Sequence, residues 1–134
     1  MPNQRPIVAV STCVFRGQEV LLVKRGQALG RGLWSLPGGK VEMGETSEVA
    51  ALRELLEETT VTATIIGLAG RFSIDAGPAR YMISCFAARH LSGIPRAASD
   101  ASDAKFALPA QILALPLAPH TLDAIAAART LLGV

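Results

Sequence analysis

Cysteine is scarce in this chain, and its placement excludes a common structural use of cysteine. The 134 residues include two cysteines, Cys13 and Cys85, which lie far apart in apolar, strand-like surroundings. No Cys-x-x-Cys spacing occurs, and no neighbouring His or Cys is available to complete a zinc site. We therefore expect both thiols to be reduced members of the hydrophobic core.

Long hydrophobic runs and a strong charge imbalance are also missing. The longest apolar stretches, such as residues 7–15, fall well short of the roughly 20 residues that span a bilayer, and the N-terminus lacks the regions of a signal peptide. The net charge of +2 is small, and the Lys and Arg residues are too scattered for a nucleic-acid footprint. We expect a cytoplasmic protein that binds neither membranes nor nucleic acid.

The acidic residues are unevenly distributed in an otherwise ordinary globular composition. Half of the residues are apolar and 18% are charged, which excludes a disordered chain. A length of 134 residues suits one domain, so we expect a single domain over residues 1–134. Six of the eleven Asp and Glu residues lie between Glu42 and Glu58. This clustering is the most informative feature of the composition.

Hydrophobic periodicity predicts strands and helices that interleave without a regular repeat. The predicted strands span residues 7–15, 19–24, 61–74, 80–89 and 105–107, and the first two form a hairpin. A helix should begin after Glu45, with Thr46 as its N-cap, and run to about Thr59. Pro109 and Pro119 are typical helix starts, and the last helix should end near residue 133. The economical architecture is an α/β fold in which helices cover both faces of a mixed β-sheet.

Three carboxylates share one face of the predicted helix. Glu54, Glu57 and Glu58 fall within about 100° of one another, and they repel each other at these spacings. A divalent cation would relieve that repulsion, because carboxylate oxygens are the ligands that Mg²⁺ and Mn²⁺ prefer. The alternative is a solvated acidic surface, which is the common role of such a sequence.

The apolar residues of the same helix predict which side is buried. Val49, Leu52 and Leu56 occupy the side opposite the carboxylates, so we expect them to face the core. Ala50 and Ala51 flank the carboxylates and should leave room for a ligand.

A glycine-rich segment precedes the helix. Residues 25–39 contain six Gly or Pro positions, so we expect a loop with a short extended piece at residues 34–36. At its end, Gly38 and Gly39 have no side chains, which lets backbone groups approach a metal or a phosphate closely.

The spacing of these residues resembles the Nudix box. That pattern is a Gly, five residues, a Glu, seven residues, Arg-Glu, an aliphatic residue, any residue, Glu-Glu, any residue, a Gly and an aliphatic residue. The chain matches it at Gly39, Glu45, Arg53, Glu54, Leu55, Glu57, Glu58 and Val61. One position departs, because Thr60 stands where the box has Gly. A β-branched Thr adopts poorly the left-handed conformation that Gly supplies there, so we expect a rearranged helix end.

The resemblance implies a Nudix fold, an α/β/α sandwich, and a metal-dependent hydrolase. In such an enzyme Glu54, Glu57 and Glu58 would ligate Mg²⁺, or alternatively Mn²⁺, together with the Gly39 carbonyl oxygen. The metal would hold the diphosphate and activate a water molecule. Arg53 would orient Glu57 through a salt bridge or take a direct part in catalysis.

The resemblance leaves the general base and the substrate open. The base is either Glu57 or Asp103, whose alternative role is that of a polar loop residue. We expect Arg25, Gly38 and Lys40 to contact the substrate, although a solvated strand end is an equally good interpretation of Arg25. The leading substrate class is a nucleoside diphosphate linked to another group, with ADP-ribose as the trial compound. The alternatives are a nucleoside triphosphate pyrophosphohydrolase and a nucleotide-binding module without catalysis, and the family's frequent dimers make a homodimer an expected assembly.

Overall fold

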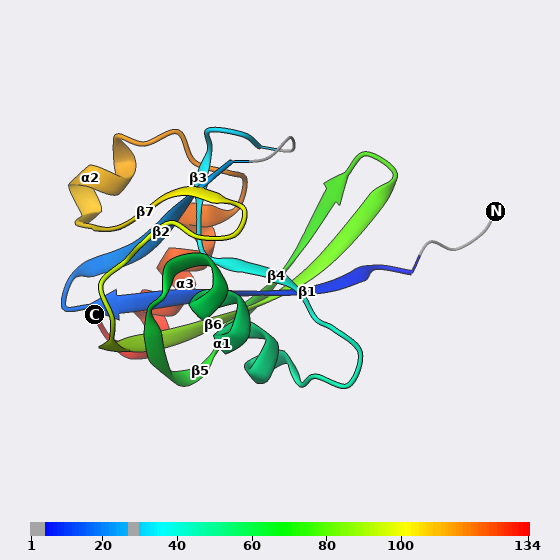
Figure 1. The fold of residues 1–134 in the computed structure, drawn as a ribbon, viewed down its shortest axis with the longest axis horizontal. Helices are drawn as coiled ribbons and strands as arrows, with labels where there is room; N and C mark the ends of the chain where they lie inside the picture. The colour runs from blue at the N-terminus through cyan, green and yellow to red at the C-terminus, as the bar shows by residue number, and fades with distance from the viewer. Residues whose placement is uncertain (1–4, 27–29) are drawn as a thin grey trace.

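The computed structural model describes residues 5–26 and 30–134 (Figure 1). Its elements follow the predicted order, except that Gly38–Lys40 forms a strand where the sequence predicted a loop. The predicted glycine-rich loop includes residues 27–29, which lie outside the described residues. No helix within the described ranges is both long and apolar enough to cross a membrane. The described residues form strands β1 (Ile7–Arg16), β2 (Glu19–Arg25), β3 (Trp34–Ser35), β4 (Gly38–Lys40), β5 (Thr62–Ala76), β6 (Ala79–Ser92) and β7 (Ala101–Ala107), and helices α1 (Ser47–Thr59), α2 (Pro109–Leu113) and α3 (Thr121–Leu132).

The strands join one mixed sheet. Its main path runs β3-β2-β1-β6-β5, while β4 pairs with β1 and β7 pairs with β2. The β1–β6 pairing is parallel, and the remaining pairings are antiparallel. Because β4 pairs with the first half of β1, with Gly39 opposite Val10, the end of the glycine-rich segment is fixed to the interior of the sheet.

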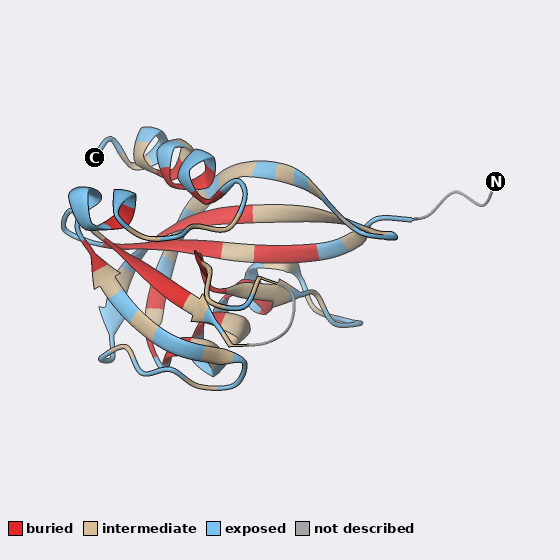
Figure 2. Ribbon diagram, turned by 90° about the horizontal axis from the view of Figure 1, so that it is seen from above, coloured by how far each residue is buried: buried red, intermediate tan, exposed pale blue. Residues whose placement is uncertain are grey.

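Side chains that alternate along β1 serve two cores, one on each face of the sheet. Val14 packs in a cluster with Leu55 of α1, whereas Cys13 belongs to a larger cluster with Cys85 and Ile125 of α3. Both cysteines are buried and free, as predicted. Figure 2 shows the buried central strands between the helical layers. The α/β/α sandwich around a mixed sheet is therefore confirmed.

The buried face of α1 differs from the predicted one. Val49, Leu52 and Leu56 are 54%, 38% and 51% exposed, whereas Ala50 and Ala51 are fully buried. The prediction was wrong because it assigned the large apolar side chains to the interior. Small side chains let the helix lie close to the sheet, so the two alanines pack in the core and leave no room for a ligand.

The end of α1 is not rearranged, and that prediction was also wrong. Thr60 adopts the left-handed conformation, with a φ of 62°, and its N–H donates to the Leu56 carbonyl oxygen at 3.0 Å. The Thr60 hydroxyl donates to the Ile94 carbonyl oxygen at 3.0 Å. This contact with a distant loop holds Thr60 in a conformation that β-branched residues disfavour. The helix therefore keeps the ending that Gly would give.

Candidate active site

The acidic helix begins as the sequence predicts and lies against β4. The Thr46 hydroxyl caps it by accepting a hydrogen bond from the Val49 N–H at 3.1 Å. Because the sheet-facing side of α1 runs through its buried alanines, Glu54 and Glu58, which lie one and two turns beyond Ala50, also turn toward the sheet. Two of the three carboxylates therefore lie at the seam between α1 and the glycines of β4, and Glu57 is more exposed.

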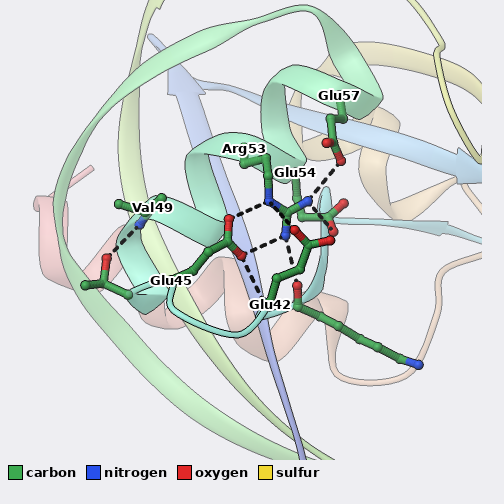
Figure 3. Close-up of polar contacts among 8 residues, drawn as sticks. Glu42, Glu45, Val49, Arg53, Glu54 and Glu57 are labelled. Atoms are coloured by element: carbon green, nitrogen blue, oxygen red, sulfur yellow. Dashed lines mark hydrogen bonds and ion pairs between the residues drawn. The ribbon is translucent and has the colours of Figure 1, made fainter.

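The acidic cluster consists of Glu45, Glu54, Glu57 and Glu58, and Arg53 donates hydrogen bonds to the first three (Figure 3). Its Nε and Nη2 donate to the two carboxylate oxygens of Glu45 at 2.6 and 3.0 Å, which makes a bidentate salt bridge. Its Nη1 donates to Glu57 at 3.0 Å and to Glu54 at 3.2 Å. Nη2 also donates to the Lys40 carbonyl oxygen at 3.1 Å. One guanidinium thus ties the helix to β4 and to the loop that joins them.

Glu45 is held rigidly on that loop. One of its carboxylate oxygens accepts a hydrogen bond from the Glu42 N–H at 2.9 Å, and the Glu45 N–H donates to the Glu42 carbonyl oxygen at 3.0 Å. The hydrogen bond from Arg53 is the main cause that lowers the pKa of Glu45 below its ordinary value. Sequence reasoning gave Glu42 no structural role, although Gly44 is typical of the third position of a turn that starts at Glu42.

The two glycines of β4 are required for different contacts. A Cβ added to Gly39 would overlap the Glu54 carboxylate, whereas a Cβ added to Gly38 would overlap the Val10 carbonyl oxygen of β1. Gly39 therefore makes space for a carboxylate, and Gly38 lets β4 approach β1. The structure thus brings the Gly39 backbone close to the Glu54 carboxylate, and the close approach to a metal or a phosphate stays a prediction.

Glu58 is the most perturbed carboxylate of the cluster. Its Oε1 accepts a hydrogen bond from the Gly38 N–H at 3.0 Å. Burial raises the pKa of Glu58 from 4.5 to about 7, and the nearby negative charge of Glu54 adds to the increase. Burial is also the main cause that raises the pKa of Glu54, against the opposing effect of Arg53. Both carboxylates are partly buried between α1 and β4, where the nearby positive charge does not offset the cost of ionising them.

The donor set of this seam fits a hard divalent cation. Glu54, Glu57 and Glu58 supply carboxylate oxygens within about one turn of helix. Burial, with a smaller contribution from neighbouring carboxylates, raises the pKa values of Glu54 and Glu58, and a bound cation would favour their charged forms. Within residues 5–26 and 30–134, however, no three acidic, His or Cys side chains already converge on a common point. The reason is that Glu54 and Glu57 turn to Arg53, while Glu58 bonds to Gly38. The carboxylates would bind a cation by turning away from these partners.

The remaining predicted site residues come from β2 and β7. Arg25, at the end of β2, is exposed, and its charge acts to lower the pKa of Glu58, while Asp100 acts to raise it. Asp103 lies in β7 opposite Lys24, and its Oδ1 accepts a hydrogen bond from the N–H of the next residue at 2.8 Å. Asp100 is thus an acid of this segment that acts electrostatically on the cluster. The sequence analysis named Asp103 and gave Asp100 no role, although both lie in the same polar run.

Comparison with known proteins identifies the family. The NUDIX domain model matches residues 5–128. An ADP-ribose pyrophosphatase of Methanocaldococcus jannaschii is 38% identical over 75% of this chain and 61% of its own length, and an oxidized purine nucleoside triphosphate hydrolase of Mus musculus is 37% identical over 61% and 54%. This chain thus spans less than two thirds of either relative. The NUDIX domain of Shewanella oneidensis NrtR, solved with ADP ribose, is 28% identical, with a TM-score of 0.84 over 96% of this chain and 90% of that domain. Since the domain match takes in the whole arrangement of β4, α1 and the acidic cluster, the chain belongs to the Nudix family.

Proposed function

We propose that this chain is a Mg²⁺-dependent hydrolase that cleaves the phosphoanhydride bond of a nucleoside diphosphate linked to another group, as in ADP-ribose. The observation that carries the proposal is the packing of the α1 carboxylates beside the glycines of β4, with Arg53 between them. The archaeal ADP-ribose pyrophosphatase and the NrtR domain bound to ADP ribose support the choice of trial substrate.

Glu54, Glu57 and Glu58 would hold the cation together with the Gly39 carbonyl oxygen. Mg²⁺ suits this oxygen donor set, and Mn²⁺ has the same preference. The bound cation would withdraw charge from the phosphorus atom and lower the pKa of an attacking water. Arg53 is a positioning residue, since its guanidinium fixes Glu57 at 3.0 Å and Glu54 at 3.2 Å.

Glu57 is the first candidate for the general base. Its side chain is half exposed, so a water molecule can reach it, while Arg53 limits its motion. The water would give its proton to Glu57 as its oxygen bonds to phosphorus, and the bond to the bridging oxygen would break to release a phosphate monoester. Asp103 is the second candidate, exposed on β7 with one oxygen engaged by its own neighbour.

The substrate phosphates would lie along β4 and the end of β2. Arg25 is the exposed cation whose charge acts on Glu58, and Lys40 is exposed at the end of β4. Gly38 is the third predicted contact, and its N–H would become available to a phosphate when Glu58 turns to the cation. Two of these three residues are therefore charges that suit an anionic substrate.

The second candidate function is hydrolysis of a nucleoside triphosphate to a monophosphate and pyrophosphate. It is favoured by the similarity to the murine oxidized purine nucleoside triphosphate hydrolase. The third is nucleotide binding without cleavage, against which the retention of Arg53, Glu54, Glu57 and Glu58 argues. The same donor set serves all three, so the products decide among them.

Product analysis with Mg²⁺ tests the proposal. The protein and its Glu57→Gln variant are incubated with ADP-ribose, other nucleotide sugars, and ordinary and oxidised nucleoside triphosphates. We expect AMP and ribose phosphate from ADP-ribose, with the rate lowered at least about 100-fold in the variant. A monophosphate with pyrophosphate from a triphosphate would move the assignment to the second function. Saturable nucleotide binding without any product would contradict the hydrolase and support the binding module.

A further inference from the structure

Helices α2 and α3 leave an apolar groove between them. The groove has a volume of about 210 Å³. Among the residues that line it, Ile112 of α2 and Ile125 of α3 are buried, whereas Leu113 and Leu122 are 71% and 46% exposed. The isoleucines therefore form the floor of the groove, and the leucines form its rims. Open apolar surface of this kind commonly marks a binding site.

The α3 wall of the groove leads to a single cation. Leu122, Ile125, Ala126 and Arg129 line it from the i, i+3, i+4 and i+7 positions of α3, which lie on one face of a helix. The distance from the first of these positions to the last is about 10 Å along the helix axis. Arg129 is the one charged residue among those that line the groove, all of which the structure describes. The groove is therefore apolar along its length and positive at one end.

Arg129 has donors to spare for a ligand. Its Nη2 donates a long hydrogen bond of 3.4 Å to the Gln18 carbonyl oxygen, and its guanidinium carbon lies 5.2 Å from the centroid of the Phe15 ring. None of the ion pairs between described residues includes Arg129. Because a guanidinium carries several N–H donors in a planar fork, those not engaged by Gln18 can bind a carboxylate.

We propose that this groove binds a medium-chain aliphatic carboxylate, with its chain between α2 and α3 and its carboxylate paired with Arg129. The volume suits about seven methylene or methyl groups, since a group the size of a water molecule takes about 30 Å³ in a liquid. Octanoate has a chain of this length. Both walls are helices, whose backbone groups bond within the helix, so they offer apolar contact to an aliphatic chain but few backbone partners to an extended peptide.

The groove lies apart from the acidic cluster. Ile112 and Ile125 belong to the core on the α3 face of the sheet, whereas α1 packs through Leu55 in the core on the opposite face. A carboxylate in the groove therefore leaves the α1 carboxylates free. Binding can be measured without turnover, so the proposal stands or fails independently of the proposed hydrolysis.

NMR chemical-shift titrations at neutral pH with hexanoate, heptanoate, octanoate, decanoate and octanamide test the proposal. We expect the shifts to centre on α2 and α3. The Kd should fall about two- to fourfold for each methylene added up to octanoate, because each one removes a similar apolar area from water. It should change little from octanoate to decanoate, whose chain is longer than the groove. Octanamide has the same length without the charge and should bind about tenfold more weakly than octanoate.

Four variants separate binding in the groove from general adhesion to the surface. Arg129→Gln should raise the Kd of octanoate about tenfold and remove its advantage over octanamide, and Arg129→Lys should restore that advantage. Ala126→Phe fills the groove and should weaken the binding of both ligands. Arg89→Gln is the matched control, because it removes an exposed cation from β6, opposite Phe15, outside the groove lining. It should bind octanoate like the wild type.

The wild-type titrations alone can overturn the proposal, so the test does not depend on the folding of any variant. A Kd that is the same for octanoate and octanamide, or that does not change with chain length up to octanoate, would do so. Equal weakening by Arg129→Gln and Arg89→Gln would also overturn it. Saturable binding of the peptide acetyl-Leu-Ala-Ala-Leu-Asp, without binding of any of the carboxylates, would assign the groove to a protein partner instead.

Discussion

Replacing Glu58 with Gln should stabilise the metal-free protein at neutral pH. A carboxyl whose pKa rises from 4.5 to about 7 on folding contributes stability that is fully present below pH 4.5 and is lost as the pH rises through 7. This difference corresponds to an upper limit of about 3 kcal/mol. Gln keeps an oxygen for the hydrogen bond from the Gly38 N–H and carries no charge. The variant should therefore lack the loss of stability that the wild type shows between pH 5 and pH 8.

Urea denaturation in EDTA, at intervals from pH 5 to pH 8, measures this difference. Trp34 is buried and reports unfolding through its fluorescence. The difference in unfolding free energy between Glu58→Gln and wild type should grow with pH toward the limit above. Glu48→Gln, an exposed change on the same helix, should keep the wild-type dependence. If the unfolding free energies of wild type and Glu58→Gln changed in parallel with pH, the claim that burial destabilises ionised Glu58 would be refuted.

Three other substitutions test the contacts around the cluster. Gly39→Ala should lower Mg²⁺-dependent turnover strongly and the melting temperature only slightly, since the added methyl group overlaps the Glu54 carboxylate. An unchanged rate would contradict this. Arg53→Lys should lower the unfolding free energy by about 1–3 kcal/mol in urea titrations, because an ammonium cannot replace the bidentate contact with Glu45. Equal stability would contradict the claim that the Arg53 hydrogen bonds hold α1 to the loop before it. Thr60→Gly should raise stability by about 0.5–1 kcal/mol, because Gly adopts the left-handed conformation without strain; a lower melting temperature would show that the Thr hydroxyl bond outweighs the strain.

The box residues could be predicted from the sequence because their spacing is local. Thr46 as N-cap, the helix to Thr59 and the nearness of Glu54 to Gly39 all depend on residues within about twenty positions of one another. The helix period fixes which carboxylates are neighbours. The helix period alone does not say which side of α1 is buried. The sequence analysis chose the side with the larger apolar residues, Val49, Leu52 and Leu56. Close packing on the sheet selected Ala50 and Ala51 instead.

Features that depend on distant segments could not be predicted. Thr60 keeps the left-handed helix end because of a hydrogen bond to Ile94, 34 residues away. The raised pKa of Glu58 depends mainly on burial against β4, a strand of the glycine-rich segment, and Asp100 in the turn before β7 adds to the increase, while Arg25 of β2 opposes it. Asp100 and Asp103 are three residues apart in the sequence, but Asp100 lies in the turn before β7 and Asp103 lies within the strand. The charge of Asp100 acts on Glu58.

The Mg²⁺ dependence of ADP-ribose hydrolysis tests most directly the claim that the α1 carboxylates hold a cation that hydrolysis requires. Initial rates are measured against Mg²⁺ concentration for the wild type, for Glu54→Gln and for the matched exposed variant Glu48→Gln. The account predicts no turnover in EDTA, the same half-saturating Mg²⁺ concentration for wild type and Glu48→Gln, and a value at least about tenfold higher for Glu54→Gln. Full turnover in EDTA, or one common Mg²⁺ curve for all three proteins, would contradict it.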